Sequence, residues 1–304
     1  MTWRVVEVSS NSKLELKLNY MVVRNEEGIK KVFIPEIAVL IIESTAVSMT
    51  AALLCELTRN EIKIVFCDEK RNPYGELSPY FGTSDCVEKI RSQISWNGTV
   101  AKTVWSEIIR HKILNQSAVL ADNGHSQESS MLNGYACEIM PGDSSNREGH
   151  AAKVYFNTIF GEGFSRRDDN PVNAALNYGY AILLSAVNRS ISAFGYSTIL
   201  GIFHSNGANP FNLGSDLMEP FRTDVDRLVL SMDFTTFDTE QKRELVNILN
   251  KTVTIDGKRN YLLNAIRIYV QSFFTAMENG DISKLKFHEA TESEAEVHES
   301  SGLL

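Results

Sequence analysis

Long hydrophobic runs, paired cysteines and proline are all scarce in this chain of 304 residues. The longest apolar runs, Ile37–Ile42 and Ala181–Leu184, fall far short of the ~18 residues that span a bilayer, so we expect no membrane segment. The N-terminus has no cationic head followed by an apolar stretch, which predicts no secretory signal. The 4 cysteines show no Cys-x-x-Cys spacing, which predicts reduced thiols in a cytoplasmic protein rather than disulfides or a zinc site. The remaining composition, 43% hydrophobic with 7 Pro and 18 Gly, excludes collagen-like, coiled-coil and largely disordered chains.

Positive charge is also in short supply, because 30 Lys and Arg face 38 Asp and Glu, for a net charge of −8. At face value this charge argues against a polyanionic partner. The last sixteen residues, Glu289–Leu304, hold five Glu and no Lys or Arg, so the rest of the chain carries only −3. A mildly acidic body can still present a local basic face, so net charge does not exclude DNA. The chain beyond Lys286 is rich in Ser and Glu without periodicity, which predicts disorder.

The first 86 residues have the pattern of a β domain. Short apolar or alternating runs such as Val39–Ile42 and Ile62–Phe66 indicate strands, with turns at Asn11-Ser12 and Asn25–Gly28. One helix is expected over Ser48–Arg59, where apolar residues recur at helical spacing. Small antiparallel sheets of this length usually pack as a sandwich.

Helical periodicity dominates after Cys86. At about 150 residues per domain the length suggests two domains. The fold class we predict is α+β: an N-terminal β-sandwich over 1–86, a C-terminal all-α catalytic domain over 87–288, and an acidic tail over 289–304. The expected helices cover Ala101–Leu120, Arg147–Phe160, Asn173–Ala193, Asp224–Ser231, Thr239–Leu249 and Tyr261–Glu278.

Three segments of the helical half could carry chemistry, and the first surrounds Glu148. On a helix, Glu148, Ala152 and Tyr155 share one face, which would hold the carboxylate beside packing residues. Ser145 and Glu148 also have the spacing of a capping box, in which the glutamate only bonds the helix N-terminus. The segment alone favours this structural role.

The second and third segments contain His204 and a pair of acids. His204 ends an apolar stretch and begins a loop rich in Gly and Asn, where a lone histidine is more often packed than a ligand. Asp216 and Glu219 are three residues apart, so both carboxylates could lie on one helical face. Acids near a helix start, which Pro220 indicates, also simply satisfy the helix dipole.

Together the three segments provide a carboxylate–histidine–carboxylate set that suits a hard divalent cation such as Mg²⁺ or Mn²⁺. Such an ion activates an oxygen nucleophile and stabilises charge on a phosphodiester. The residues alone therefore support a metal-dependent phosphoryl-transfer enzyme.

Four motifs, in order along the chain, resemble those of the universal CRISPR-associated integrase family. The resemblance extends over the β-rich region and essentially the whole chain except the acidic tail. Met1–Val6 and Trp105–Gln116 are similar to the subtype II-A branch. The four motifs are Arg147–Phe156, Asn173–Leu183, Gly201–His204 and Asp216–Arg222.

The resemblance implies that Glu148, His204 and Glu219 are the catalytic metal-binding residues. Many relatives have Asp where this chain has Glu219, which keeps the carboxylate and adds one methylene. Asp216 matches a nearby acid of the family, to which we give an auxiliary role.

The resemblance also implies an activity and its partners. Two homodimers would flank one dimer of the small second CRISPR-associated protein and hold a DNA duplex with 3′ single-stranded ends. Each 3′ hydroxyl would attack a phosphodiester at a border of a CRISPR repeat, a transesterification without ATP or a protein nucleophile. With water in place of the hydroxyl, the same site would act as a nuclease. The β domain would serve dimerisation and partner contact, or else only stability.

Phosphate contacts are expected from basic residues of the helical half. The candidates are Lys102, Arg110 and Lys112 on one helix, with Arg166 and Arg167 in a later loop. Interspersed Lys and Arg also form ordinary solvated faces, and Arg167 could pair internally with the acids that follow it. Trp96 and Trp105 could stack on bases, although core packing is the more common role.

Two functions from other classes remain open. A stand-alone metal-dependent nuclease would shorten DNA without joining it. A non-catalytic DNA-binding scaffold would use the three motif residues only as caps and core.

Overall fold

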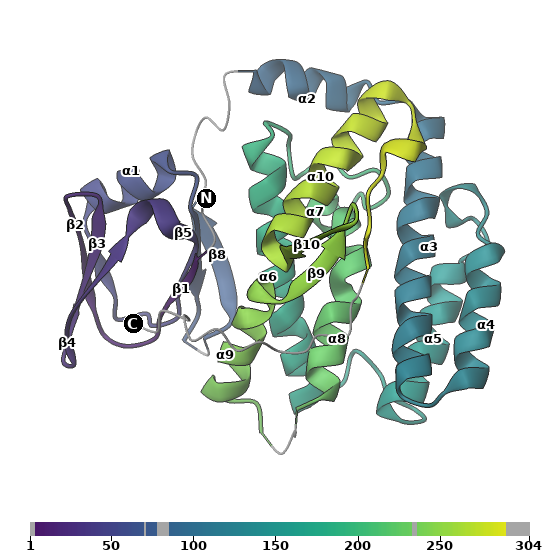
Figure 1. The fold of residues 1–304 in the computed structure, drawn as a ribbon, viewed down its shortest axis with the longest axis horizontal. Helices are drawn as coiled ribbons and strands as arrows, with labels where there is room; N and C mark the ends of the chain where they lie inside the picture. The colour runs from purple at the N-terminus through teal and green to yellow at the C-terminus, as the bar shows by residue number, and fades with distance from the viewer. Residues whose placement is uncertain (1–3, 70, 78–84, 233–235, 290–304) are drawn as a thin grey trace.

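The N-terminal part of the computed structural model is a sandwich of two four-stranded sheets, as predicted (Figure 1). The structure describes residues 4–69, 71–77, 85–232 and 236–289, so the first three residues of the predicted β domain and residues 290–304 of the predicted tail lie outside it. The first sheet has the order β1 (Arg4–Val8), β5 (Ile37–Ile42), β7 (Lys63–Cys67), β8 (Pro73–Leu77). The second has the order β4 (Gly28–Phe33), β3 (Tyr20–Asn25), β2 (Lys13–Lys17), β6 (Ser48–Met49).

The first sheet is buried on both faces. Successive side chains of a strand point to opposite faces. Val6 and Leu40 accordingly join the cluster between the two sheets, whereas Val5 and Val39 join the large cluster of the helical half. The sandwich and the helices therefore share a continuous apolar layer.

The expectation of purely antiparallel sheets was wrong. β1 pairs with β5 and β5 with β7 in parallel, and β2 also pairs with β6 in parallel. Parallel neighbours need a crossover connection, and the chain from β5 to β7 contains α1 (Ala51–Arg59). α1 begins three residues later than predicted because the Thr50 hydroxyl caps the Leu53 amide, which leaves Ser48 and Met49 to form β6.

The helical half contains the six predicted helices with small shifts at their ends. One of them, α5, has the predicted bounds. Short 3₁₀ turns join several helices: η2 (Pro141–Asp143), η3 (Glu219–Phe221), η4 (Ile248–Asn250) and η5 (Ile282–Lys284), with η1 (Ile34–Glu36) in the sandwich. The helices are α2 (Cys86–Ile94), α3 (Gly98–Asp122), α4 (Ser126–Cys137), α5 (Arg147–Phe160), α6 (Pro171–Ala193), α7 (Asn212–Leu217), α8 (Arg222–Leu230), α9 (Thr239–Asn247) and α10 (Leu262–Asn279).

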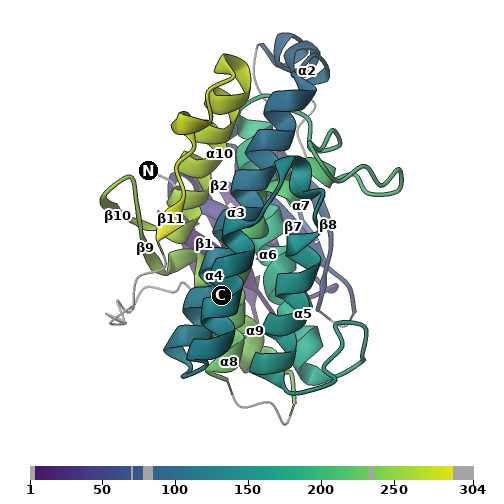
Figure 2. The ribbon, with the colours of Figure 1, turned by 90° about the vertical axis from the view of Figure 1, so that its right-hand side faces the viewer.

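This half is not all-α, which corrects the sequence prediction. β10 (Lys258–Tyr261), β9 (Thr252–Ile255) and β11 (His288–Glu289) form a small antiparallel sheet. A tight turn with positive φ at Asp256 and Gly257 joins β9 to β10. The sequence prediction also missed α2, α7 and α4, of which α4 packs beside α3 and α5 (Figure 2).

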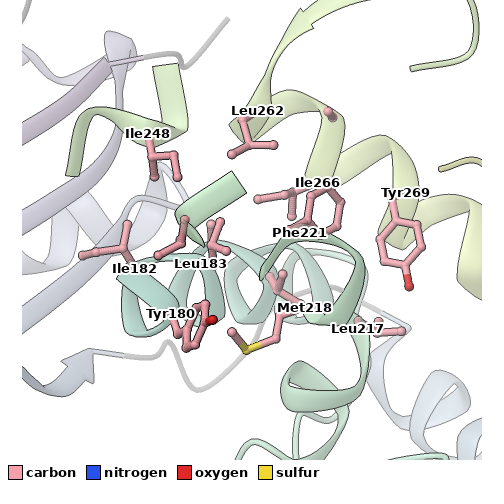
Figure 3. Packing of buried hydrophobic residues seen from close by; sticks show 14 of the residues in the cluster. Tyr180, Ile182, Leu183, Leu217, Met218, Phe221, Ile248, Leu262, Ile266 and Tyr269 are labelled. Carbon is pink, nitrogen blue, oxygen red and sulfur yellow. The ribbon is translucent and has the colours of Figure 1, made fainter. Parts of the chain in front are cut away.

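α6 is the central helix of this half. It contacts β7 and β8 on one side and α7 to α10 elsewhere. Tyr180 and Leu183 of α6 face Met218 and Phe221 of the following segment, and Ile266 of α10 closes the cluster (Figure 3). The segment with Glu219 is therefore held rigidly against the core.

The predicted disorder beyond Lys286 begins too early. Phe287 stacks on His111 with a ring distance of 3.6 Å, and His288 is buried and bonds to Asp224 at 2.8 Å. These contacts join β11 to α3 and α8. No helix in the described parts of the chain has the length and apolar character needed to cross a membrane.

Candidate active site

Lys112 of α3 joins two of the three predicted site residues. Its Nζ lies 2.6 Å from Glu148 Oε1 and 2.6 Å from Glu219 Oε2. Glu148 is 36 residues away on α5 and Glu219 lies in η3, so only the tertiary fold brings the three together. Two of the predicted residues thus share one site.

Glu148 projects from the first turn of α5 without capping it. Asp143 caps this helix, since its carboxylate accepts from the amides of Arg147 at 2.8 Å and Glu148 at 3.0 Å. The capping box of Ser145 and Glu148 does not form, because the N-cap position falls on Asn146. The carboxylate of Glu148 therefore pairs with Lys112 in the site and does not bond the helix N-terminus.

Glu219 is buried and fully compensated. Its Oε2 accepts from Arg222 Nε at 2.9 Å as well as from Lys112. Burial raises the pKa of Glu219, but the charges of Arg222 and Lys112 outweigh it and lower this pKa to about 2. Burial likewise lowers the pKa of Lys112, yet Glu219 and Glu148 raise it overall. Glu219, Lys112 and Arg222 are consequently charged at neutral pH.

His204 is oriented by Asp216 of α7. The Asp216 carboxylate accepts from the amides of Ile202, Phe203 and His204 at 2.7, 3.1 and 3.0 Å, and from His204 Nδ1 at 2.6 Å. A Cβ on Gly201 would lie 2.4 Å from the His204 carbonyl oxygen, so this tight loop requires glycine.

The other ring nitrogen of His204, Nε2, has no hydrogen-bond partner in the described parts of the chain. The hydrogen bond to Asp216 raises the pKa of His204, burial opposes this, and the charges of Asp216, Glu219 and Glu148 raise it further. The charges of the two glutamates therefore act on His204. Asp216, named only as auxiliary from the sequence, has the position of a carboxylate that orients a histidine side chain.

The metal site stays a prediction, because the donor types suit a divalent ion but are not assembled into a cluster. Two carboxylates and an imidazole fit a hard divalent cation. In the described parts of the chain, however, no three His, Cys, Asp or Glu side chains lie close enough together to hold a metal ion. The Lys112 ammonium lies between the two carboxylates, where a cation is attracted. The residues fit a divalent ion there if Lys112 moves aside.

The predicted basic face on α3 does not form as a single surface. Lys102 is exposed, whereas Lys112 is buried in the site. Arg110 is half-buried and donates to the Ala136 carbonyl at 2.8 Å, which joins α3 to α4. Arg110 and Lys112 are held by partners that are distant in the sequence, so local sequence patterns do not reveal that they form no single exposed surface with Lys102.

The second basic pair is also divided. Arg166 donates to Asn173 and Asn177 of α6 and lies over the Tyr180 ring, so it is part of the packing there. Arg167 is exposed and forms no ion pair with the following acids among the described residues, so the alternative of internal pairing is not observed. Of the predicted phosphate contacts, Lys102 and Arg167 are the exposed ones.

Both tryptophans are packed, in agreement with the more common role. Trp105 is fully buried and stacks on Phe203. Trp96 packs edge-on against Phe273. Sequence reasoning missed Asp143, Arg222 and Phe203, and only Arg222, three residues after Glu219, had a local signal in its spacing.

The fold is that of solved CRISPR-associated proteins. A Cas1 protein from Thermotoga maritima matches with a TM-score of 0.69 at 18% identity, over 90% of this chain and 96% of that chain. A casposase bound to integration product matches with a TM-score of 0.73 at 18% identity, over 92% and 91%. A chain of a Cas6-RT-Cas1–Cas2 complex matches with a TM-score of 0.71 at 19% identity, over 94% of this chain and 36% of that chain.

The sequence comparisons define the family. Residues 6–241 match the sequence model described as "CRISPR associated protein Cas1". The CRISPR-associated endonuclease Cas1 of Neisseria meningitidis serogroup C is 34% identical over 95% of this chain and 97% of that protein. A Cas1 endonuclease of Francisella tularensis subsp. novicida is 26% identical over 85% and 88%. The chain belongs to the Cas1 family, which confirms the predicted family, while the likeness to the subtype II-A branch stays a prediction.

Proposed function

We propose that this chain is the integrase of CRISPR adaptation, which joins the 3′-hydroxyl ends of short DNA duplexes to the borders of a CRISPR repeat. The observation that carries the proposal is the pairing of Glu148 and Glu219 on Lys112, with the Asp216-oriented His204 near enough for the charges of both glutamates to act on it. Family membership and the named endonuclease relatives support phosphodiester chemistry at this site.

The reaction exchanges one phosphodiester for another. The 3′ oxygen of the incoming DNA end bonds to a phosphorus of the repeat border while the bond from that phosphorus to its own 3′ oxygen breaks. The proton of the attacking hydroxyl ends on the leaving oxygen, so no energy source is consumed.

The residues of this chain divide the work of the site. Glu148, Glu219 and His204 Nε2 would hold Mg²⁺ or Mn²⁺, which when bound activates an oxygen nucleophile and stabilises charge in the transition state. Asp216 fixes the His204 ring so that Nε2 faces the site. Arg222 keeps Glu219 ionised. Lys112 is a second positive charge beside the position where negative charge develops.

The assembly we propose has two homodimers of this chain flanking a dimer of the small second CRISPR-associated protein in the cytoplasm. Matching chains come from complexes named for Cas1 with Cas2 and from a complex named for Cas1 with DNA, which supports both partners. An acidic chain binds DNA better in such an assembly, because the second engagement is intramolecular.

A supercoiled CRISPR plasmid distinguishes integration from the alternatives. Incubation with this chain, the small partner, a labelled duplex with 3′ overhangs and Mg²⁺ or Mn²⁺ should give label covalently joined at the repeat borders. Shortening of the duplex without joining would instead identify the stand-alone nuclease, which the endonuclease names of the relatives favour as the second candidate. Unchanged activity of Glu148→Ala would leave only the scaffold function.

A further inference from the structure

An aromatic ring with one open face lies beside His204. Phe203 stacks on Trp105 with a centroid distance of 4.3 Å and an interplanar angle of 8°. Trp105 is fully buried, yet 49% of Phe203 is exposed. One face of the Phe203 ring is therefore covered by a core residue, while much of the rest of the ring is open.

This ring cannot easily turn away from the site. The Phe203 amide donates to Asp216 at 3.1 Å, and the amides on either side of it donate to the same carboxylate. The rings of Phe203 and His204 are 5.6 Å apart and nearly perpendicular, and the His204 ring also meets Trp105 edge-on. One buried tryptophan and one buried aspartate thus fix the open ring and the histidine together.

We propose that Phe203 is a stacking platform for an unpaired nucleobase at the 3′ single-stranded end of the DNA. The inference rests on the proposed function, which supplies DNA ends at His204. A base lies one sugar ring away from its phosphates, so a nucleotide that reacts at His204 has its base within reach of a neighbouring ring. Bases in a duplex are already stacked, whereas an overhang base has a free π face.

Aromatic stacking also fits the demands of such a substrate. Every base has a π face, so the contact tolerates any sequence. Stacking on an aromatic side chain strengthens binding by roughly tenfold per base. A platform held in place before binding costs little ordering when the base arrives.

The full-length protein with the small partner provides the test, with 2-aminopurine as the probe because stacking quenches its fluorescence. One duplex carries the probe at the end of a 3′ overhang that terminates in a 3′-deoxy sugar, and a second duplex carries it within the paired region. We expect the wild type to quench the overhang probe strongly. Phe203→Leu still covers Trp105 but has no π face, so it should lose this quenching and bind overhang DNA about tenfold more weakly.

Two further variants isolate the aromatic face. Phe203→Tyr should retain the quenching, since its ring stacks equally well. Ile199→Ala removes an exposed apolar side chain (57%) of the same loop and should leave quenching and affinity unchanged. Full quenching by Phe203→Leu, or no quenching by the wild type, would overturn the platform.

The same protein preparations are assayed for strand joining with matching duplexes that end in a 3′ hydroxyl, which separates this inference from the proposed function. Joining by a wild type that does not quench the probe would refute the platform and leave the integrase function standing. Quenching without joined or cleaved DNA would refute the catalytic function and leave the platform standing.

Discussion

Lys112 Nζ lies 2.6 Å from Glu219 Oε2, and both side chains are buried. The same ammonium contacts Glu148 at 2.6 Å, so one cation connects α3, α5 and η3. Removing one partner of a buried ion pair leaves an uncompensated charge and is strongly destabilising. The site is thus held together by a charge that a divalent ion would have to displace.

Lys112→Met should separate the stabilising role of the Lys112 ammonium from its competition with a divalent ion. Without divalent ions the variant leaves Glu148 and Glu219 facing each other, and we expect it to lose about 3 kcal/mol of unfolding free energy. Mn²⁺ should then stabilise the variant more than the wild type, because no ammonium competes for the carboxylates. Thermal unfolding in EDTA and in Mn²⁺ measures both effects.

Lys102→Met, on the exposed side of α3, is the control and should change stability by less than about 0.5 kcal/mol. Equal Mn²⁺ stabilisation of Lys112→Met and wild type would show that the ammonium does not compete for the metal site.

Single substitutions of the three proposed ligands should abolish strand joining. Glu148→Ala, His204→Ala and Glu219→Ala each remove a donor, and the loss of transition-state stabilisation amounts to several kcal/mol. Glu219→Asp keeps a carboxylate that is one methylene shorter, so we expect partial activity. Joining is measured on the CRISPR plasmid, with circular dichroism as the control for folding. Full activity of a folded Glu148→Ala would end the catalytic hypothesis.

Local patterns and motifs predicted the elements that carry the site, but not the contacts between its residues. The bounds of α5 followed from its own periodicity, and the motifs identified Glu148, His204 and Glu219. The placement of Lys112 between two of them depends on contacts with residues 36 and 107 positions away, which no local pattern contains. α4 was missed because its sequence is rich in Ser with an internal Gly, and its helix depends on packing, as in the buried contact of Ser129 with Ser117 on α3.

Glu7 should make stability fall as the pH rises. Burial, with the hydrogen bond and the charge of Glu43, raises the pKa of Glu7 to about 8. The unfolded side chain titrates near 4.3, so between pH ~4.3 and ~8 only the folded state holds this proton. Unfolding free energy should therefore drop by up to about 1.4 kcal/mol per pH unit in this window. Glu7→Gln cannot ionise and should lose less.

Urea unfolding at pH 5.5 and pH 8 tests this difference. Glu15→Gln is the matched control, since its exposed carboxylate pairs with Arg24, which lowers its pKa, and so does not titrate in the window. If Glu7→Gln and wild type lost the same free energy over this range, Glu7 would not be the titrating group.

DNA binding should depend on the exposed basic residues only. Each phosphate contact changes the slope of log affinity against log salt by about 0.9. Lys102→Ala and Arg167→Ala should each weaken duplex binding equally for all sequences and reduce this slope by about one unit. Lys112→Met should leave the slope unchanged because its ammonium is buried. Binding titrations over a salt series in the presence of the small partner measure the slopes, and an unchanged slope in the double variant would clear both residues of phosphate contact.

Two truncations should separate β11 from the acidic tail. A chain that ends after Glu289 loses only residues whose acidic composition predicts neither packing nor DNA binding, so its stability and integration should match the full chain. A chain that ends after Lys286 also loses the Phe287 stack on His111 and the His288 bond to buried Asp224. His288 and Lys251 together hold the pKa of Asp224 at about 2 against the effect of burial, so the shorter chain leaves this charge partly uncompensated. We expect the shorter chain to lose about 3 kcal/mol of unfolding free energy, which lowers Tm by roughly 5–10 °C.

Calorimetry of the two chains tests both expectations. A fall of several degrees for the longer chain would mean that the tail docks on the rest of the protein. An unchanged Tm for the shorter chain would mean that β11 contributes nothing to stability.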